Sequence, residues 1–250
     1  MPKEYTSGSL QILDGLDAVR MRPGMYIGST GARGLHHLLW EIVDNGIDEA
    51  ANDYANEVAV TLHKDGSCSV WDNGRGVPVD MHPTLGISGV EVIYTKLHAG
   101  GKFDHENYGY SGGLHGVGAS VVNALSKWMT VDSFRDWEHW QIRFETIYDS
   151  KEKKWKAGQI VEPLHKVGNT RKHGTLVRFM PDDTIFEEMR FNADTVRRRL
   201  RELAYLNRGT AISFTDERAP APGNETYVFC YQGGIADFVS YLNKDKTSLY

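Results

Sequence analysis

The chain has 250 residues, of which 40% are hydrophobic and 24% charged, proportions that are ordinary for a folded globular protein. Its 28 lysines and arginines stand against 33 aspartates and glutamates, and the net charge of −5 argues against a broad basic surface for nucleic acid within these residues. No stretch approaches 18 apolar residues and the first eight residues are polar, so neither a membrane span nor a secretory signal is expected.

The N-terminal half is predicted to begin with a polar arm over residues 1–10 and a short helix at 15–20, which Pro23 ends. Apolar residues at helical spacing predict an amphipathic helix over 34–55. Alternating residues predict strands at 57–63 and 67–71 around a hairpin turn at 64–66. Residues 80–111 are rich in glycine and polar residues, and we expect a long excursion there around a short helix at 90–97.

The C-terminal half is predicted to start with a helix at 119–127, followed by strands at 129–134, 139–147, 158–162 and 175–180. The charged segment 149–156 is interpreted as a turn or an insertion. Asn192 is expected to cap a helix that runs to about residue 207, strands at 210–215 and 226–231 are expected to pair, and a final helix is expected at 235–243. This arrangement favours an α+β fold with a mainly antiparallel or mixed sheet and helices on one face.

The two cysteines, Cys68 and Cys230, lie far apart and lack the spacing of metal ligands. Both fall in strand-like runs, so they are interpreted as buried free thiols. A reducing, cytoplasmic location fits this interpretation.

Two glycine-rich segments, 72–76 and 112–118, indicate one pocket built from two places in the chain. Glycine lets backbone N–H groups converge on a ligand without a Cβ in the way. The second segment leads directly into a predicted helix, whose N-terminus favours an anion such as phosphate. Nucleotide binding is therefore the first hypothesis.

One face of the helix predicted at 34–55 carries His37, Glu41, Asp44, Asn45 and Asp48. No lysine or arginine occurs between Arg33 and Lys64, although six acids do. This face is either simply solvated or a site where a bound cation relieves the negative charge. In the second interpretation the Asn45 oxygen suits Mg²⁺ beside phosphates, and His37 could hold Glu41 as a general base.

Asp72 follows a predicted strand and begins the first glycine segment. Its carboxylate could accept a hydrogen bond from an exocyclic amine, as on adenine, or it could be a turn aspartate that satisfies local backbone groups. Arg75, between two glycines, could be a surface residue or a wall of the pocket. The residues alone leave these alternatives open.

Better-known nucleotide motifs do not fit the chain. Lys102 follows two glycines as in a P-loop, but Phe103 occupies the Ser/Thr position. The segment 116–118 fails as a dinucleotide fingerprint because Val121 stands at the third glycine position.

The whole set of motifs, in this order, resembles the GHKL ATPase superfamily: Glu41 and Asn45, then 72–76, then 112–118, then 174–175. Three further runs, at 22–28, 97–103 and 120–126, resemble the ATPase subunits of bacterial type IIA topoisomerases, namely the DNA gyrase B subunit or its close alternative in topoisomerase IV. The similarity runs from about residue 9 to residue 246, nearly the whole chain.

The resemblance implies a Bergerat-type two-layer α/β sandwich, with residues 1–250 forming a single ATPase domain. Residues 1–14 would be a dimerisation arm, and 244–250 a tail that precedes a transducer domain absent from this chain. The implied function is Mg²⁺-dependent hydrolysis of ATP that drives strand passage through double-stranded DNA, with negative supercoiling by a gyrase. Turnover by these residues alone is expected to be weak, because in the family the transducer supplies a lysine to the γ-phosphate.

By the same resemblance, Glu41 is the general base, His37 supports it, and Asn45 holds Mg²⁺. Asp72 would read the adenine amine with Thr175 nearby, and Tyr5 of the arm would reach the nucleotide of the partner subunit. Arg75 and Arg135 would flank the mouth of the pocket, where coumarin-type inhibitors bind in the family. The remaining nucleotide-binding residues implied are Glu49, Gly76, Val77, Pro78, Ile93, Gly101, Lys102, Tyr108, Leu114, His115, Gly116, Val117 and Gly118.

The implied partners are a second copy of this chain, joined through the arm when ATP is bound, and a gyrase A-type subunit and DNA contacted through other regions. The chain departs from the family pattern at Asn73, where an acid is common, at Trp40, where a smaller aromatic is usual, and over 149–169, interpreted as a surface insertion. A nucleotide-gated dimerisation module with little turnover is the alternative function. A histidine-kinase catalytic domain fits less well, because it does not require the run at 97–103 or the arm.

Overall fold

The structure is a computed structural model that describes residues 15–99, 116–219 and 226–244. Within these ranges, eight strands form one sheet in the order β5-β4-β3-β6-β2-β1-β7-β8. Neighbouring strands are antiparallel except β1 and β7, which are parallel. The strands are β1 (Glu57–Leu62), β2 (Cys68–Asp72), β3 (Ser126–Arg135), β4 (Glu138–Asp149), β5 (Lys154–Asn169), β6 (Gly174–Pro181), β7 (Ala211–Asp216) and β8 (Thr226–Phe229).

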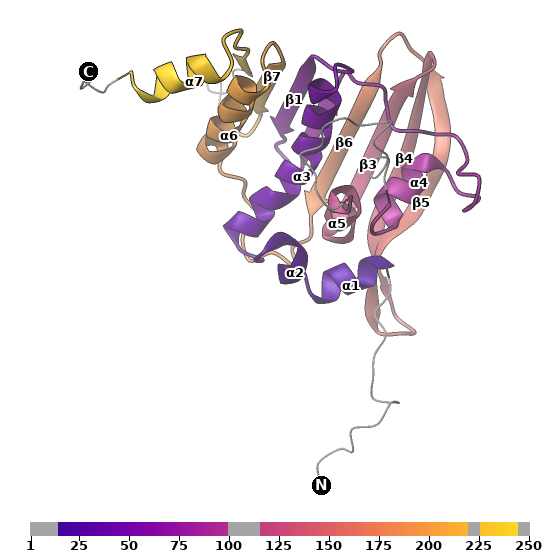
Figure 1. Cartoon of the computed structure of the whole chain (residues 1–250). Helices are drawn as coiled ribbons and strands as arrows, with labels where there is room; N and C mark the ends of the chain where they lie inside the picture. Colours follow the sequence, from indigo (N-terminus) through magenta and orange to yellow (C-terminus); the bar gives the residue numbers. More distant parts are fainter. Residues whose placement is uncertain (1–14, 100–115, 220–225, 245–250) are drawn as a thin grey trace.

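Helices cover one face of this sheet, which confirms the predicted two-layer α+β architecture (Figure 1). The long helix α3 lies across β1 and β2, α5 lies beside it over the centre of the sheet, and α6 lies next to β7. Their apolar side chains share one buried core with the sheet. The helices are α1 (Gly15–Met21), α2 (Gly24–Ile27), α3 (Ala32–Ala51), α4 (Gly89–Thr95), α5 (Gly118–Ala124), α6 (Ala193–Leu206) and α7 (Ile235–Leu242). No helix in the described ranges is long and apolar enough to cross a membrane.

The sequence prediction was wrong in the middle of the chain. Helix α5 ends at Ala124 rather than 127, because Ser126 already pairs with Pro181 of β6 as the first residue of β3. Residues 154–156, predicted as part of a turn, begin the 16-residue strand β5. Lys156 forms an ion pair with Asp149 (2.7 Å) at the end of β4, so the charges support the hairpin instead of breaking it.

The two cysteines differ in environment. Cys68 is fully buried in β2, as predicted, and burial raises the pKa of its thiol. Cys230 is exposed, so its predicted burial is wrong. Strand β8 ends at Phe229, and Cys230 lies just beyond the paired residues.

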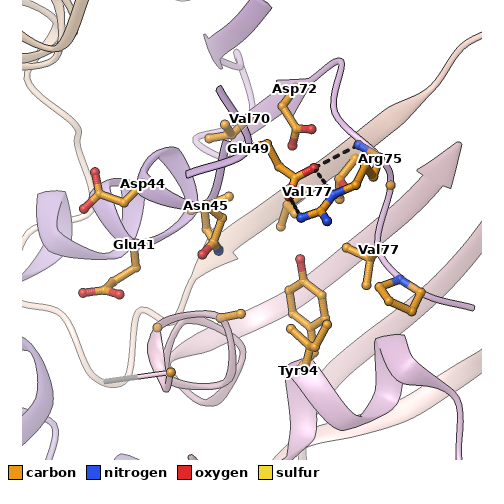
Figure 2. Close-up of a pocket in the computed structure, with 18 of the residues that line it drawn as sticks. Glu41, Asp44, Asn45, Glu49, Val70, Asp72, Arg75, Val77, Tyr94 and Val177 are labelled. Atoms are coloured by element: carbon orange, nitrogen blue, oxygen red, sulfur yellow. Dashed lines mark hydrogen bonds and ion pairs between the residues drawn. The ribbon is translucent and has the colours of Figure 1, made fainter. Parts of the chain in front are cut away.

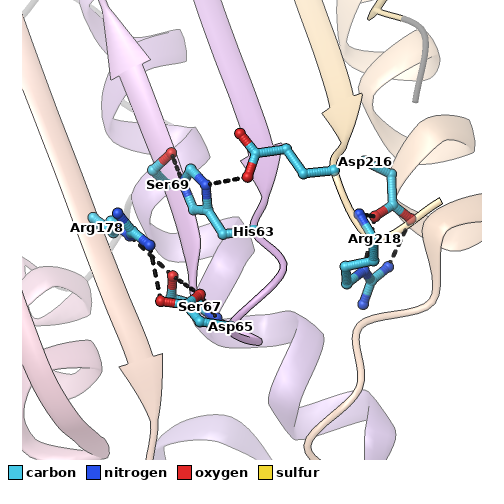
Figure 3. A network of polar contacts seen from close by, with 8 residues as sticks. His63, Asp65, Ser67, Ser69, Arg178, Asp216 and Arg218 are labelled. Carbon is cyan, nitrogen blue, oxygen red and sulfur yellow. Dashed lines mark hydrogen bonds and ion pairs between the residues drawn. The ribbon is translucent and has the colours of Figure 1, made fainter. Parts of the chain in front are cut away.

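The other face of the sheet carries a polar network at the end of the β1–β2 hairpin (Figure 3). Ser69 alternates with the buried Cys68 and Val70, and its hydroxyl lies 2.8 Å from Nε2 of His63. Nδ1 of His63 lies 3.0 Å from a Glu217 carboxylate oxygen, beyond the end of β7. Hydrogen bonds thus replace apolar packing on this face and hold the hairpin that presents Asp72 at its far end.

A buried ion pair joins α1 to the segment that follows β6. Nη1 of Arg20 lies 2.7 Å from Oδ2 of Asp182, and Nη2 donates to the Thr184 hydroxyl (2.7 Å). The two charged side chains are only 7% and 4% exposed. Burial disfavours the Asp182 carboxylate, but the donors of Thr184 and the Arg20 charge outweigh it and lower its pKa.

We predict that Arg20→Met lowers the free energy of unfolding by about 3 kcal/mol, because it leaves a buried carboxylate without its cation. The double variant Arg20→Met/Asp182→Asn should lose less than the two single losses combined. Chemical denaturation measures both. The control is Lys127→Met, whose exposed pair with Asp183 (3.5 Å) should contribute less than about 1 kcal/mol. Equal effects of Arg20→Met and Lys127→Met would contradict the prediction.

Candidate functional site

A cavity of about 400 Å³ lies between α3, α4, α5 and the helix-facing side of the sheet. It brings together most of the site residues predicted from the sequence that fall in the described ranges. These are Glu41, Asn45, Glu49, Asp72, Arg75, Gly76, Val77, Pro78, Ile93, Gly116, Gly118, Arg135 and Thr175.

Two predicted residues are described but do not line the cavity. His37 lies one helical turn before Glu41 and contacts its carboxylate. Val117 precedes α5 and packs against the core. The others lie outside the described residues: Tyr5, Gly101, Lys102, Tyr108, Leu114 and His115.

Helix α3 supplies the polar wall of the cavity. Glu41, Asn45 and Glu49 are four residues apart, so they rise along one side of the helix while Leu38, Leu39 and other apolar residues face the core (Figure 2). Asp48, predicted on the same face, is 1% exposed and does not line the cavity. The polar face of α3 that lines the cavity is therefore shorter than the face predicted from the sequence.

The cation that balances Glu49 comes from another element. Nη2 of Arg75 lies 2.6 Å from Oε1 of Glu49, and both Nε and the backbone N–H of Arg75 donate to Oε2. The guanidinium also lies over the ring of Tyr54, 3.6 Å from its centroid. The expectation of acids lacking a cationic partner was wrong for Glu49, since inspecting residues 33–64 alone could not include Arg75.

Asp72 and Thr175 meet at one end of the cavity because β2 and β6 are neighbours. The two residues are directly opposite in the antiparallel ladder, and Val70 lies opposite Val177 two residues further along. All four line the cavity, with the two valines as an apolar floor beside the polar pair. Sequence reasoning missed both valines, because nothing local shows that strands about a hundred residues apart are paired.

The first glycine segment closes tightly around two carboxylates. The Gly74 N–H donates to Oδ1 of Asp72 (2.8 Å). A Cβ on Gly74 would lie 2.7 Å from Oε2 of Glu49 and 2.8 Å from Oδ1 of Asp72, closer than real Cβ atoms come. Residue 74 must therefore be glycine because the carboxylates of Asp72 and Glu49 leave no room for a side chain. Its N–H also donates a hydrogen bond to Asp72.

Asn73, which departs from the family pattern, has a structural contact. Its Oδ1 accepts hydrogen bonds from the backbone N–H groups of Asn56 and Glu57 (2.9 Å each). The side chain thereby fixes the start of β1 against the end of β2, and an amide does this without adding charge beside Asp72.

Burial raises the pKa of Asp72 to about 7. The hydrogen bonds from the N–H groups of Gly74 and Thr175 and the electrostatic effect of His173 oppose the rise, whereas the charge of Glu49 adds to it. A strongly shifted group that faces a cavity is a candidate for function. Its carboxylate is a hydrogen-bond acceptor that a buried donor on a ligand would stabilise.

Glu41 lies at the other end of the cavity, against the first residue of α5. A Cβ on Gly118 would collide with Oε2 of Glu41, so glycine allows the carboxylate to approach the helix end. Oε1 of Glu41 lies 3.0 Å from Nε2 of His37. This hydrogen bond raises the pKa of His37, burial opposes it, and the charges of Glu41 and Asp44 add to it. His37 is thus placed to orient Glu41 and to share a proton with it.

We predict that Asp72→Asn is more stable than the wild type at pH 8, by at most about 4 kcal/mol, and that the difference disappears near pH 4. The folded-state pKa of about 7 lies above the reference value of 3.8, so the folded chain holds a proton that the unfolded chain releases. Wild-type stability therefore falls as pH rises from 4 to 7. Denaturation at several pH values measures this, with exposed Asp183→Asn as control. A difference independent of pH would refute the shifted pKa.

Comparison with known proteins agrees with the motifs. Residues 30–184 match the family described as histidine kinase-, DNA gyrase B-, and HSP90-like ATPase. The DNA gyrase B subunit of Thermotoga maritima is 50% identical over 248 residues, which are 99% of this chain and 37% of that protein. The DNA topoisomerase 4 B subunit of Enterococcus faecalis is 53% identical over 247 residues, 98% of this chain and 34% of that protein.

A solved relative has the same fold. It is the 43K ATPase domain of Thermus thermophilus gyrase B in complex with an aminocoumarin, with a TM-score of 0.79 and 44% identity. The similarity covers 94% of this chain and 56% of that one. This chain spans about a third of the length of the curated relatives it matches.

Proposed function

This chain belongs to the histidine kinase-, DNA gyrase B-, and HSP90-like ATPase family, and we propose that its cavity binds and hydrolyses Mg²⁺–ATP. The observation that carries the proposal is the order of the polar residues along the cavity. Asp72 and Thr175 lie at one end and Glu41 at the other, with Asn45 between them on α3 (Figure 2). This order matches a molecule with an amine-bearing base at one end and phosphates at the other.

At the base end, the Asp72 carboxylate would accept a hydrogen bond from the exocyclic amine of adenine, with Thr175 beside it. Val77, Pro78 and Ile93 line the cavity with the two floor valines and would contact the base. The amine would replace water as the partner of a buried carboxylate, and a hydrogen bond to a charged group contributes about 1.5–3 kcal/mol.

At the phosphate end, Gly116 and Gly118 line the cavity where α5 begins. Backbone N–H groups there would face the phosphates. The segment that precedes them, with Leu114 and His115, and the residues Gly101, Lys102 and Tyr108 are proposed to complete this end, and Tyr5 to reach the nucleotide of a partner subunit. These residues lie outside the described ranges.

The residues that line the cavity fit a Mg²⁺ ion that is bound mainly by the phosphates of the nucleotide and by water. Within the described ranges no three His, Cys, Asp or Glu side chains cluster as a metal site. Mg²⁺ usually keeps several waters and takes one or two protein oxygens besides the substrate phosphates, and the Asn45 side chain lining the cavity can supply one. When bound, the ion would neutralise phosphate charge.

Glu41 would act as the general base, taking a proton from the water that attacks the terminal phosphate. His37 would hold the carboxylate toward the cavity through the 3.0 Å contact. A general base contributes about 10²–10⁴-fold to a rate.

As part of a type IIA topoisomerase, this ATPase activity would drive strand passage through double-stranded DNA in the cytoplasm, with a gyrase A-type subunit as partner and a second copy joined through residues 1–14. The relatives named gyrase and topoisomerase 4 support a type IIA topoisomerase. Because the Thermus thermophilus domain was solved with an aminocoumarin, we also propose that such inhibitors bind at the rim formed by Arg75 and Arg135, which line the cavity.

The decisive experiment is calorimetry of a non-hydrolysable ATP analogue, with and without Mg²⁺. Asp72→Asn should weaken binding about tenfold to hundredfold, since the acceptor loses its charge. Asn45→Ala should instead reduce the gain in affinity that Mg²⁺ provides. A triphosphate of purine riboside, which lacks the amine, should bind wild type and Asp72→Asn alike. Unchanged ATP-analogue binding by Asp72→Asn would refute the proposed orientation of the nucleotide.

Glu41→Gln should bind the analogue within about twofold of the wild type but hydrolyse ATP at least about a hundredfold more slowly. The amide keeps the size of the side chain and cannot accept the proton. Single-turnover hydrolysis with excess protein measures the chemical step. Glu202→Gln, on the outer side of α6, is the matched control. Wild-type turnover by Glu41→Gln would remove Glu41 from the role of general base.

A further inference from the structure

Tyr94 lines the base end of the cavity, although neither its position nor its type was singled out in the sequence. It is the sixth residue of α4 and only 2% exposed. Figure 2 shows its hydroxyl pointing into the cavity, toward the side on which Asp72 lies. The cavity is also lined by the apolar side chains of Val70, Val77 and Val177 and by the polar side chains of Asp72 and Thr175.

One contact of the ring and two features of α4 hold Tyr94 in this position. It stacks on Phe144 of β4, with ring centroids 6.2 Å apart and planes at 28°. The Tyr94 carbonyl oxygen accepts a hydrogen bond from Nδ2 of Asn123 in α5 (2.9 Å). A capping box between Ser88 and Glu91 sets the start of the helix. The hydroxyl is therefore preorganised, and a ligand need not order it.

The hydroxyl is also a donor throughout the physiological pH range. Burial raises the pKa of Tyr94, and the charge of Asp72 raises it further. The phenol thus stays neutral and keeps its proton, while Asp72 is acceptor-only when ionised. The cavity consequently presents a hydroxyl that keeps its proton and, when Asp72 is ionised, a carboxylate acceptor.

We propose that Tyr94 is a base-recognition residue whose hydroxyl donates a hydrogen bond to N1 of adenine, next to the exocyclic amine that donates to Asp72. The inference rests on the proposed function and extends it to base specificity. Adenine presents a donor amine beside the acceptor N1, which complements this pair. Guanine presents the reverse, a carbonyl oxygen beside an N–H, so its carbonyl oxygen would face the Asp72 carboxylate, two acceptors without a proton between them, although the Tyr94 oxygen could accept from its N–H. Sites built on such hydrogen bonds reject the mismatched ligand strongly.

The test combines Tyr94→Phe with ATP analogues altered at one atom. Tyr94→Phe keeps the ring and its stacking on Phe144 and removes only the hydroxyl, so the thermal unfolding midpoint should be unchanged. We expect it to weaken ATP binding about threefold to tenfold. The 1-deaza analogue of ATP, which lacks N1, should bind the wild type more weakly by a similar factor and should bind Tyr94→Phe no worse than ATP does.

Two controls locate the effect. The 7-deaza analogue keeps N1, so Tyr94→Phe should weaken its binding as much as that of ATP. Tyr148→Phe, at an exposed tyrosine of β4 that packs on Trp155, should change no affinity. The inference is wrong if Tyr94→Phe binds ATP as tightly as the wild type. It is also wrong if the losses of affinity caused by the 1-deaza change and by Tyr94→Phe are additive. Neither result would contradict the proposed ATP site. If the wild type binds no ATP, or Asp72→Asn has no effect, the proposed function itself fails.

Discussion

The burial of the Asp72 carboxylate is the constraint on which the rest of the site depends. It ends β2 under α3 and is only 7% exposed, and the chain supplies N–H donors from Gly74 and from Thr175 on the neighbouring strand. Those donors require that β2 pair with β6 in one register and that residue 74 have no side chain. Gly74 is therefore needed because two carboxylates pack against it. The glycine segment is also fixed in place, because Arg75, the next residue, is hydrogen-bonded to Glu49.

Helix α3 sets the length of the site. Glu41, Asn45 and Glu49 span two turns, about 12 Å at 1.5 Å per residue. One end of that span is tied to the base end of the cavity through Glu49 and Arg75, and the other touches the start of α5 through Glu41. A single rigid element therefore fixes how far the carboxylate proposed as general base lies from the carboxylate proposed to read the base. Loops could vary this distance, but a helix packed along its apolar side against the sheet does not.

Local features of the sequence predicted the polar residues of the site and did not predict its apolar walls. Glu41, Asn45 and Asp72 belong to short patterns whose chemistry depends on residue type and spacing, so they could be identified from the chain alone. Val70, Val177 and Tyr94 reach the cavity only through the pairing of β2 with β6 and the docking of α4 against α5, contacts between distant segments. Most helices and strands were predicted from the local sequence, but the four-residue helix α2 was not. The start of β5 did not, because its lysines find carboxylate partners across the hairpin and need no solvent-exposed turn.

Two buried aspartates show how such a structure separates stability from function. Asp182 is buried and faces the Arg20 guanidinium, and its pKa is lowered, so its charge is satisfied within the fold. Asp72 is 7% exposed, and the charge that acts on it most strongly is that of another acid, Glu49, so its pKa is raised to about 7. An ionised Asp72 costs folding free energy that an arginine beside it would relieve. That arginine would also occupy the position of a ligand's donor. The fold places Arg75, three residues further along the chain, on Glu49 instead, which leaves the Asp72 acceptor directed at the cavity, where a base with the complementary edge can recover the cost.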